Sequence, residues 1–269
     1  EMLRIEIGEL REDFGIEAFD LVGFSAEDLA DILPDALIDT TGGLTDPDDV
    51  PEVPETPITR PGDVWVLGPH RLLCGDSTVA TDVQKVLGDV KADLCFCDPP
   101  YNVDYAGGVG AEKAGKGRRI KNDALGDGFG QFLYDACVLI NAHTDGAVYI
   151  CMSSSELRTL QAAFKSAGGH WSTFIIWAKD RFTLGRSDYQ RQYEPILYGW
   201  PEGVKRHWCG DRDQGDVWNI ERPHKNDLHP TMKPVVLVER AIRNSSRKGD
   251  LVFDPFGGSG TTMIAAEGT

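Results

Sequence analysis

The tetrapeptide Asp98-Pro99-Pro100-Tyr101 places a carboxylate and an aromatic ring on either side of two prolines, a set of groups that could bind or orient a substrate. It follows the apolar run from Ala92 to Cys97, which predicts a buried strand of a parallel sheet. Ligands of open α/β sheets bind just beyond the carboxyl ends of strands. Neither proline has an N–H, and their fixed φ stops the strand from continuing. The Asp98 carboxylate and the Pro99 carbonyl therefore offer two acceptors beside an aromatic ring.

Two acceptors beside an aromatic face suit a planar heterocycle with an exocyclic amine, such as an adenine or cytosine flipped out of a duplex. The structural alternative is a strand followed by a proline-rich turn, with Asp98 as an N-cap. This stretch alone leaves both interpretations open.

A second stretch, from Asp250 to Ala266, predicts a strand, an acidic residue, a glycine-rich turn and a helix. Glycines let the backbone approach a ligand closely, and a helix N-terminus supplies free N–H groups. Gly260-Thr261-Thr262 lacks the lysine of a P-loop, which disfavours hydrolysis of nucleoside triphosphates, and the G-x-G-x-x-G pattern is absent. A glycine loop without a cation, next to two acidic strand ends, suits a ligand that carries its own positive charge.

Together these stretches resemble the amino-methyltransferases of DNA that use S-adenosylmethionine (SAM). Asp98 to Tyr101 resembles their catalytic motif, Asp254 to Thr262 their SAM-binding motif, and His229 to Pro234 the segment before it. The catalytic motif comes first, which is the permuted order of the β group. Across residues 65 to 269 the resemblance implies an α/β fold: a Rossmann-like SAM-dependent methyltransferase with a mainly parallel sheet, helices on both faces and a circularly permuted motif order.

The resemblance also implies roles for individual residues. Catalytic roles fall to Asp98, Pro99, Pro100 and Tyr101. Cofactor-binding roles fall to Asp76, Ser77, Asp98, Thr231, Lys233, Asp254, Phe256, Gly257, Gly258, Ser259, Gly260, Thr261 and Thr262. Of these, Asp76 and Ser77 would contact the adenine ring of SAM, and Thr231 and Lys233 would lie near its carboxylate end. The alternatives are Asp76 or Ser77 as a helix N-cap and Lys233 as a surface cation at a helix start.

The implied reaction is attack of the N6 amine of a flipped adenine on the methyl group of SAM, an in-line displacement in which the protein supplies position and electrostatics. Asp98 and the Pro99 carbonyl would hold the amine, and Tyr101 would stack on the base. Asp rather than Ser at position 98 favours adenine over cytosine N4. A catalytically silent DNA-binding module and an RNA or small-molecule methyltransferase remain alternatives. Because the chain stops at Thr269, before the family's acidic ribose ligand, we expect weak SAM binding.

The net charge of −16 divides unevenly along the chain. Residues 1–60 carry 17 acidic and 3 basic residues, a net of −14, and residues 61–269 carry 26 and 24, a net of −2. The second part can therefore hold a local basic groove for double-stranded DNA, although the first would repel phosphates. The predicted DNA-binding residues follow a glycine-rich stretch or interleave with tryptophans. They are Lys113, Lys116, Arg118, Arg119, Lys121, Lys205 and Arg206.

Composition and periodicity divide the chain into three parts. Residues 1–40 form an acidic segment with a short helix, and residues 41–62 form a linker rich in Pro and Asp. Residues 63–269 form the methyltransferase domain, C-terminally incomplete, with 200–228 as the candidate target-recognition insert. Residues 102–125 or a second subunit would complete that compact insert, so a homodimer stays open, and Trp218 is expected in the core. In the resembled family a linker of this kind often follows a ParB-like nuclease domain.

The secondary-structure pattern alternates strands with helices. We expect a hairpin that leads into a strand ending at Asp76, followed by four helices and three strands in addition to those predicted above. The helices are 79–88, 128–140, 154–167 and 235–244; the strands are 146–152, 173–178 and 194–199.

Six cysteines lie mostly in apolar runs, which indicates reduced core thiols. We expect Cys95 and Cys97 to point to opposite faces of their strand, so that they make no metal pair. His207, Cys209, His224 and His229 lack the spacing of a zinc site, and no metal is predicted. No apolar run is long enough for a membrane span, and no signal peptide is visible, so we expect a cytoplasmic protein of bacterial or phage origin. Because residue 1 is Glu, we expect a piece of a longer chain.

Overall fold

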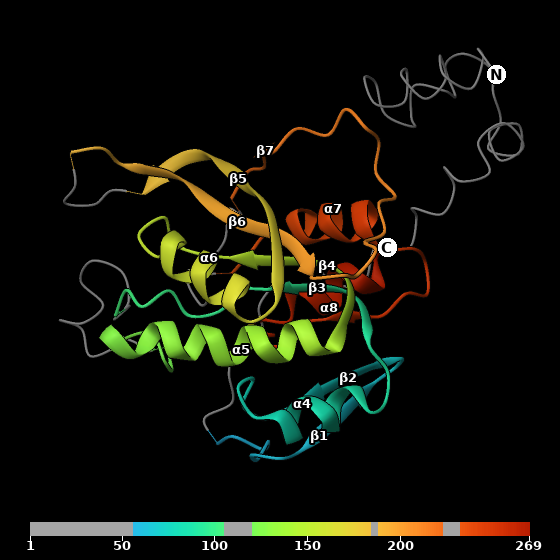
Figure 1. The fold of residues 1–269 in the computed structure, drawn as a ribbon. Coiled ribbons are helices and arrows are strands. Elements are labelled where there is room, and N and C mark those ends of the chain that lie inside the picture. The colour runs from blue at the N-terminus through green and yellow to red at the C-terminus, as the bar shows by residue number, and fades with distance from the viewer. Residues whose placement is uncertain (1–55, 105–119, 184–187, 223–231) are drawn as a thin grey trace, which may run out of the picture. The chain divides into compact units, whose positions relative to one another are not determined.

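The computed structural model describes residues 56–104, 120–183, 188–222 and 232–269 (Figure 1). The chain divides into two compact units, Glu1–Asp46 and Pro47–Thr269, and all described residues belong to the second. The expected N-terminal helix and most of the expected linker lie outside the described residues.

The described chain begins with the expected hairpin, in which β1 (Val64–Leu67) pairs antiparallel with β2 (His70–Leu73). The predicted helix follows as α4 (Ala80–Leu87). The second strand ends at Leu73, not at Asp76 as expected. The N-cap alternative for Asp76 and Ser77 is wrong, because the N-cap position is Val79 and no side chain caps the helix.

A six-stranded sheet forms the centre of the second unit, in the order β7-β5-β6-β4-β3-β8. β3 pairs parallel with β4 and with β8, β5 pairs parallel with β7, and β6 is antiparallel to both of its neighbours. Five of the six strands thus run in one direction, which confirms the mainly parallel sheet. The strands are β3 (Ala92–Cys97), β4 (Thr144–Cys151), β5 (Gly169–Thr183), β6 (Arg191–Pro201), β7 (Val217–Asn219) and β8 (Val252–Phe253).

Helices cover both faces of this sheet, as predicted (Figure 1). On one face, Cys95 and Cys97 pack in a cluster with Phe129 and Leu133 of α5. On the other, Leu94 packs with residues of α7 and α8. The strand alternates between the two clusters because successive side chains point to opposite faces. The helices are η2 (Gly126–Gly128, a 3₁₀ turn), α5 (Phe129–His143), α6 (Leu157–Ser166), α7 (Val235–Ser245) and α8 (Thr261–Glu267).

The expectation that Cys95 and Cys97 point to opposite faces is wrong. Residues two apart in a strand share a face, and both thiols lie in the same buried cluster. Burial raises the pKa of Cys97 well above its ordinary value, and Cys95 adds to this effect. All six cysteines are free. Within the described ranges no group of three or more His, Cys, Asp or Glu side chains is placed to hold a metal ion.

The described part of the predicted insert, residues 200–222, returns the chain along the sheet. Cys209 N donates to Asn244 O (2.7 Å) at the end of α7, and β7 then joins the edge of the sheet. Trp218 on β7 is 2% exposed, which confirms the core role expected for it. Among the helices of the described part, none combines the length and the apolar character that crossing a bilayer requires.

The core of β3 can be tested through Leu94, which is fully buried. We expect Leu94→Ala to lower the free energy of unfolding by about 2–5 kcal/mol, because the lost methyl groups leave a cavity. Val90→Ala, at an exposed position just before the strand, should change it by less than about 0.5 kcal/mol. Urea denaturation measures both variants, and equal losses would contradict the assigned burial.

Candidate functional site

The predicted catalytic tetrapeptide begins where β3 ends, and its backbone is held from a distant segment. Tyr101 N donates to Asp123 Oδ1 (2.8 Å), and Asp123 is buried. Asn102 adopts a positive φ of 58°, and its Oδ1 accepts bonds from Leu125 N and Gly126 N (both 2.9 Å). Asparagine tolerates this left-handed conformation better than most residues. Asp123 and Asn102 therefore fix the turn that carries Asp98 and Tyr101, a role that sequence reasoning missed.

Both carboxylate oxygens of Asp98 accept hydrogen bonds from protein groups. The Tyr101 hydroxyl donates to Oδ1 (2.5 Å), and Lys233 Nζ donates to Oδ2 (2.7 Å). Lys233 is only 6% exposed, and its Nζ lies 5.2 Å from the centroid of the Tyr101 ring. The alternative of Lys233 as a surface cation is therefore wrong. It lies immediately before the N-cap of α7, and its ammonium reaches Asp98 at the end of β3.

Glu194 is the member of this cluster that the sequence prediction missed. Its Oε2 lies 3.1 Å from Lys233 Nζ and 3.3 Å from the Tyr101 hydroxyl, as an alternative acceptor for the one proton that the hydroxyl donates to Asp98. Its Oε1 accepts a short hydrogen bond from Lys179 Nζ, which lies 4.5 Å from the centroid of the Trp177 ring. A charged residue next to the apolar run of β6 was the available signal, because a carboxylate there needs a buried partner.

The cluster joins two carboxylates, Asp98 and Glu194, to two ammonium groups. Burial alone would raise the pKa of Glu194, but Lys233 and Lys179 hold it at about 2. Burial raises the pKa of Asp98; Lys233 opposes this and Glu194 reinforces it. Burial would lower the pKa of Lys233, but the two carboxylates raise it above its ordinary value. The pKa of Lys179 is lowered by burial, which Glu194 only partly offsets.

The Tyr101 hydroxyl stays protonated and therefore acts as a donor. Burial raises its pKa well above the ordinary value, and the Asp98 and Glu194 carboxylates add to the effect. A neutral phenol beside two carboxylates keeps its proton available for the hydrogen bond to Asp98.

The predicted glycine loop lies next to this cluster because β8 pairs with β3. Gly258 and Gly260 have φ of 52° and 85°, conformations that favour glycine, and Gly260 is the N-cap of α8. Asp254, which follows β8, accepts bonds from Phe256 N (2.8 Å) and from the Thr262 hydroxyl (2.6 Å). Burial raises the pKa of Asp254 to about 6, and Asp98 contributes to this shift. The two predicted motifs are thus brought to one edge of the sheet.

Hydrogen bonds link other predicted cofactor residues to the same edge. The Ser259 and Thr261 hydroxyls are 3.0 Å apart, and the Thr261 hydroxyl donates to Lys233 O (3.4 Å). The β1–β2 hairpin lies close to the same loop: a Cβ built onto Gly257 would be 3.8 Å from Leu72 Cδ1 of β2, an ordinary van der Waals distance. The hairpin therefore packs near the glycine loop.

Asp76 and Lys121, predicted for different ligands, contact each other. Asp76 Oδ1 accepts bonds from the Thr78 hydroxyl (2.7 Å) and Thr78 N (3.0 Å), which lower the pKa of Asp76. Its Oδ2 lies 3.5 Å from Lys121 Nζ. Lys121, expected at DNA, is thus paired with a residue expected at SAM.

The structure does not bring Lys205 and Arg206 to the Asp98 edge. β6 is antiparallel to its neighbours, so Glu194 near its start lies at that edge and Pro201 at its end lies at the opposite edge, about 23 Å along the strand. Arg206 follows Pro201 and stacks on Trp200, with its guanidinium carbon 4.3 Å from the ring centroid. The remaining predicted contacts lie outside the described residues: Lys113, Lys116, Arg118, Arg119 and Thr231.

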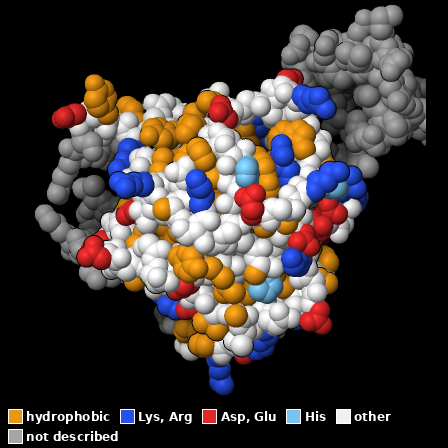
Figure 2. Space-filling view, in the orientation of Figure 1, with side chains coloured by type: hydrophobic (Ala, Val, Ile, Leu, Met, Phe, Trp, Pro, Cys, Tyr) orange, Lys and Arg blue, Asp and Glu red, His pale blue; other side chains and the backbone are white. Residues whose placement is uncertain are grey.

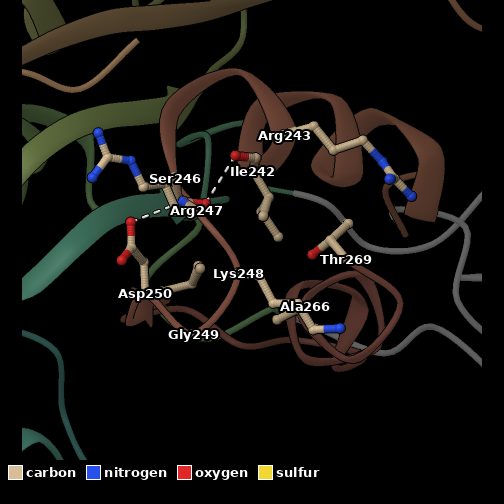
Figure 3. Close-up of a pocket in the computed structure, with 10 residues that line it drawn as sticks. Ile242, Arg243, Ser246, Arg247, Lys248, Gly249, Asp250, Ala266 and Thr269 are labelled. Carbon is tan, nitrogen blue, oxygen red and sulfur yellow. Dashed lines mark hydrogen bonds between the residues drawn. The ribbon is translucent and has the colours of Figure 1, made fainter. Parts of the chain in front are cut away.

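A cavity of about 240 Å³ lies between the end of α7, the turn before β8 and α8 (Figure 3). Arg247 N donates to Asp250 Oδ2 (2.8 Å) within its lining. None of the predicted catalytic or cofactor residues lines it. Its walls are Ile242, Arg243, Ser246, Arg247, Lys248, Gly249, Asp250, Val252, Ala266 and Thr269. It is therefore separate from the charged cluster.

The permuted α/β sheet, with an acidic strand end beside a glycine loop, defines the class of Rossmann-like methyltransferases. Residues 92–269 match the sequence profile of the DNA methylase family, which covers N6 and N4 methyltransferases, and the chain belongs to this family. Residues 1–61 match the helix-turn-helix domain of ParB-methyltransferases, across both the predicted acidic segment and the predicted linker.

The chain is similar to several bacterial DNA methyltransferases. The chain is 27% identical over 206 residues to the type II methyltransferase M2.MboI of Moraxella bovis, covering 68% of this chain and 75% of the relative. It is 26% identical to M.HpaI of Haemophilus parainfluenzae (71% and 65% covered) and 26% identical to the DNA adenine methyltransferase YhdJ of Escherichia coli (65% and 67% covered). The crystal structure of the M1.HpyAVI–SAM complex superposes with a TM-score of 0.50 at 22% identity, over 70% of this chain and 84% of that one, which supports the fold.

The raised pKa of Asp254 predicts a pH dependence of stability. Its folded pKa of about 6 exceeds the ordinary value of 3.8, so between these values the folded state binds more protons than the unfolded state. The free energy of unfolding contributed by Asp254 therefore falls as pH rises through that window. We expect Asp254→Asn to gain stability relative to the unmodified chain across pH 4 to 6, by at most about 3 kcal/mol.

Urea denaturation at several pH values measures this gain. Thr262→Val, which removes a donor that stabilises the Asp254 carboxylate, should instead steepen the loss of stability with rising pH. A difference between Asp254→Asn and the unmodified chain that stays constant from pH 4 to 7 would contradict the assigned environment.

Proposed function

We propose that this DNA methylase transfers a methyl group from SAM to the exocyclic N6 amine of an adenine flipped out of duplex DNA. The observation that carries the proposal is the pairing of β3 with β8, which sets Asp98 next to the glycine loop that follows Asp254. An acceptor for the amine and a loop for the methyl donor then share one edge of the sheet.

The residues of the glycine loop fit SAM. A Cβ placed on Gly260 would meet nothing within 4 Å, so the loop backbone is open there, and the carboxyl group of Asp254 at the start of the loop suits a cationic ligand. Residues 254–262, together with Lys233 and the Asp76–Ser77 segment, would hold it. When bound, SAM supplies an electrophilic methyl group.

Asp98 orients the target amine in this proposal. Its carboxylate and the Pro99 carbonyl accept the two N–H groups, so that the nitrogen lone pair faces away from the base plane. Tyr101, whose hydroxyl is anchored on Asp98, offers its ring to the base. The site would accelerate the transfer by positioning the amine and by electrostatic stabilisation rather than through a covalent intermediate with the protein.

Adenine is the preferred target for two reasons. Asp rather than Ser occupies position 98, and the relative YhdJ is named a DNA adenine methyltransferase. Transfer to cytosine N4 is the second candidate, because the family covers both reactions and the amine chemistry is shared.

We further propose that duplex DNA approaches the β5–β6 hairpin. Cys151, the last residue of β4, pairs with Ile196, so the first residues of β6 extend beyond the Asp98 edge (Figure 1). Three exposed aromatic rings come from this part of the chain: Phe182 near the end of β5 (54% exposed), Tyr189 just before β6 (91%) and Tyr193 in β6 (44%). Exposed rings beside a catalytic edge can stack on unpaired bases. The space-filling view shows hydrophobic side chains interspersed with Lys and Arg on one face of the molecule (Figure 2).

Other expectations stay predictions: residues 63–269 as the methyltransferase domain, residues 200–228 as the recognition insert, a homodimer and a cytoplasmic location.

The reaction can be tested by methyl transfer from labelled SAM to mixed-sequence duplex DNA, followed by nucleoside analysis. We expect label in N6-methyladenine, and Asp98→Ala should reduce the rate by at least about 100-fold, since it removes the acceptor that orients the amine. Label in N4-methylcytosine would move the target to the second candidate. A folded protein that labels no DNA would favour the silent DNA-binding module.

The DNA surface can be tested with two aromatic variants. Tyr189→Ala should raise the KM for duplex at least about fivefold, corresponding to about 1 kcal/mol of lost stacking, with little change in the KM for SAM. Trp208→Ala, in the predicted insert, is the matched control. If Trp208→Ala raises the KM for duplex and Tyr189→Ala does not, the insert rather than the hairpin contacts DNA.

A further inference from the structure

Both carboxylate oxygens of Asp98 already accept a hydrogen bond from a buried donor. Tyr101 donates to Oδ1 at 2.5 Å and Lys233 to Oδ2 at 2.7 Å. An incoming N–H donor must therefore share an oxygen with one of these donors or displace it, since each carboxylate oxygen has only two lone pairs. A displaced ammonium or hydroxyl in a buried site needs another acceptor, because an unpaired buried polar group is costly.

Glu194 is the second acceptor of both donors. Its Oε2 is 3.1 Å from Lys233 Nζ and 3.3 Å from the Tyr101 hydroxyl. Both bonds are longer than the corresponding bonds to Asp98, so small movements of the two donors would exchange one carboxylate for the other. The other oxygen, Oε1, is held by Lys179, which fixes the orientation of the carboxylate.

We propose that Glu194 is a positioning residue that takes over the Lys233 ammonium and the Tyr101 hydroxyl when the target amine binds Asp98. This inference rests on the proposed function. The handover keeps the number of charges in the cluster unchanged and leaves each donor with an acceptor. It frees the oxygens of Asp98 without exposing an unpaired ammonium.

The groups that face Asp98 come from every element packed around it. They are Tyr101 from its own segment, Cys151 from β4, Glu194 from β6, Lys233 from the segment before α7 and Asp254 from the loop after β8. Lys179 of β5 acts on the cluster through Glu194. The pKa of the Cys151 thiol is raised well above its ordinary value by burial, so this group adds no charge in the range of an activity profile.

Glu194→Gln in the full chain tests the handover, with Glu239→Gln as the matched control. Glu239 lies on α7, outside the predicted catalytic, cofactor and recognition segments, and its Oε2 lies 4.0 Å from Arg243 Nη2. We expect Glu194→Gln to lower kcat about tenfold or more, because Lys233 then has only Asp98 as a carboxylate partner. The KM for SAM should change less than about threefold.

The pH profile distinguishes this role from a merely structural one. Glu194 raises the pKa of Asp98, so its replacement by Gln should move the acid limb of the kcat profile to lower pH. Carbon NMR titration of labelled aspartate carboxyls, with Asp98 assigned by Asp98→Asn, should show the same downward shift without DNA. Glu239→Gln should leave kcat and the acid limb unchanged.

The outcomes separate the two proposals. If the unmodified chain transfers no methyl group, the proposed function fails. If the unmodified chain is active, two results overturn only the handover. In the first, Glu194→Gln has the same kcat as the unmodified chain. In the second, Glu194→Gln loses activity but leaves the acid limb and the Asp98 titration unmoved. If Glu194→Gln fails to fold, Glu194→Asp is the second test, because it keeps the negative charge but shortens the side chain. We expect Glu194→Asp to lower kcat and to leave the acid limb unmoved. An unchanged kcat would overturn the handover.

Discussion

The arrangement at the end of β3 depends on one ammonium group that neutralises two carboxylates. Lys233 lies within 3.1 Å of both Asp98 and Glu194, and it is almost fully buried. Two carboxylates this close repel each other in a poorly solvated site, and without a shared cation one of them would take up a proton. Lys179 completes the balance from the other side of Glu194. The charges are thus compensated inside the sheet edge rather than by solvent.

Sheet topology sets which residues can share that ammonium. β8 comes last among the strands of the described part, yet it pairs with β3, so the glycine loop and the Asp98 segment become neighbours. The reversed direction of β6 carries Glu194 to the same edge and takes Lys205 and Arg206 to the opposite one. Membership of the DNA methylase family accounts for the motifs, and the pairing of strands accounts for their meeting.

Several features could be predicted because they depend on local patterns. The apolar run before Asp98 became β3, the glycines of the loop adopt positive φ, and Trp218 lies in the core. Glu194 was missed because its significance depends on Lys233 and Lys179, which come from other elements. The prediction that Cys95 and Cys97 point to opposite faces of the sheet was wrong, although the two-residue period of a strand was sufficient to place both side chains on one face.

The sequence by itself determined the kinds and order of most elements, though not β7, and it determined the two motifs and the family resemblance, since these follow from residue types and short spacings. The tertiary structure alone decided that Asp98, Tyr101, Glu194 and Lys233 form one hydrogen-bonded cluster and that Asp123 holds the turn beneath it. It also decided that Lys233 lies at the Asp98 edge and that Arg206 lies at the opposite one. These outcomes depend on strand order and direction, which arise from packing across the whole sheet and are not encoded in any single segment.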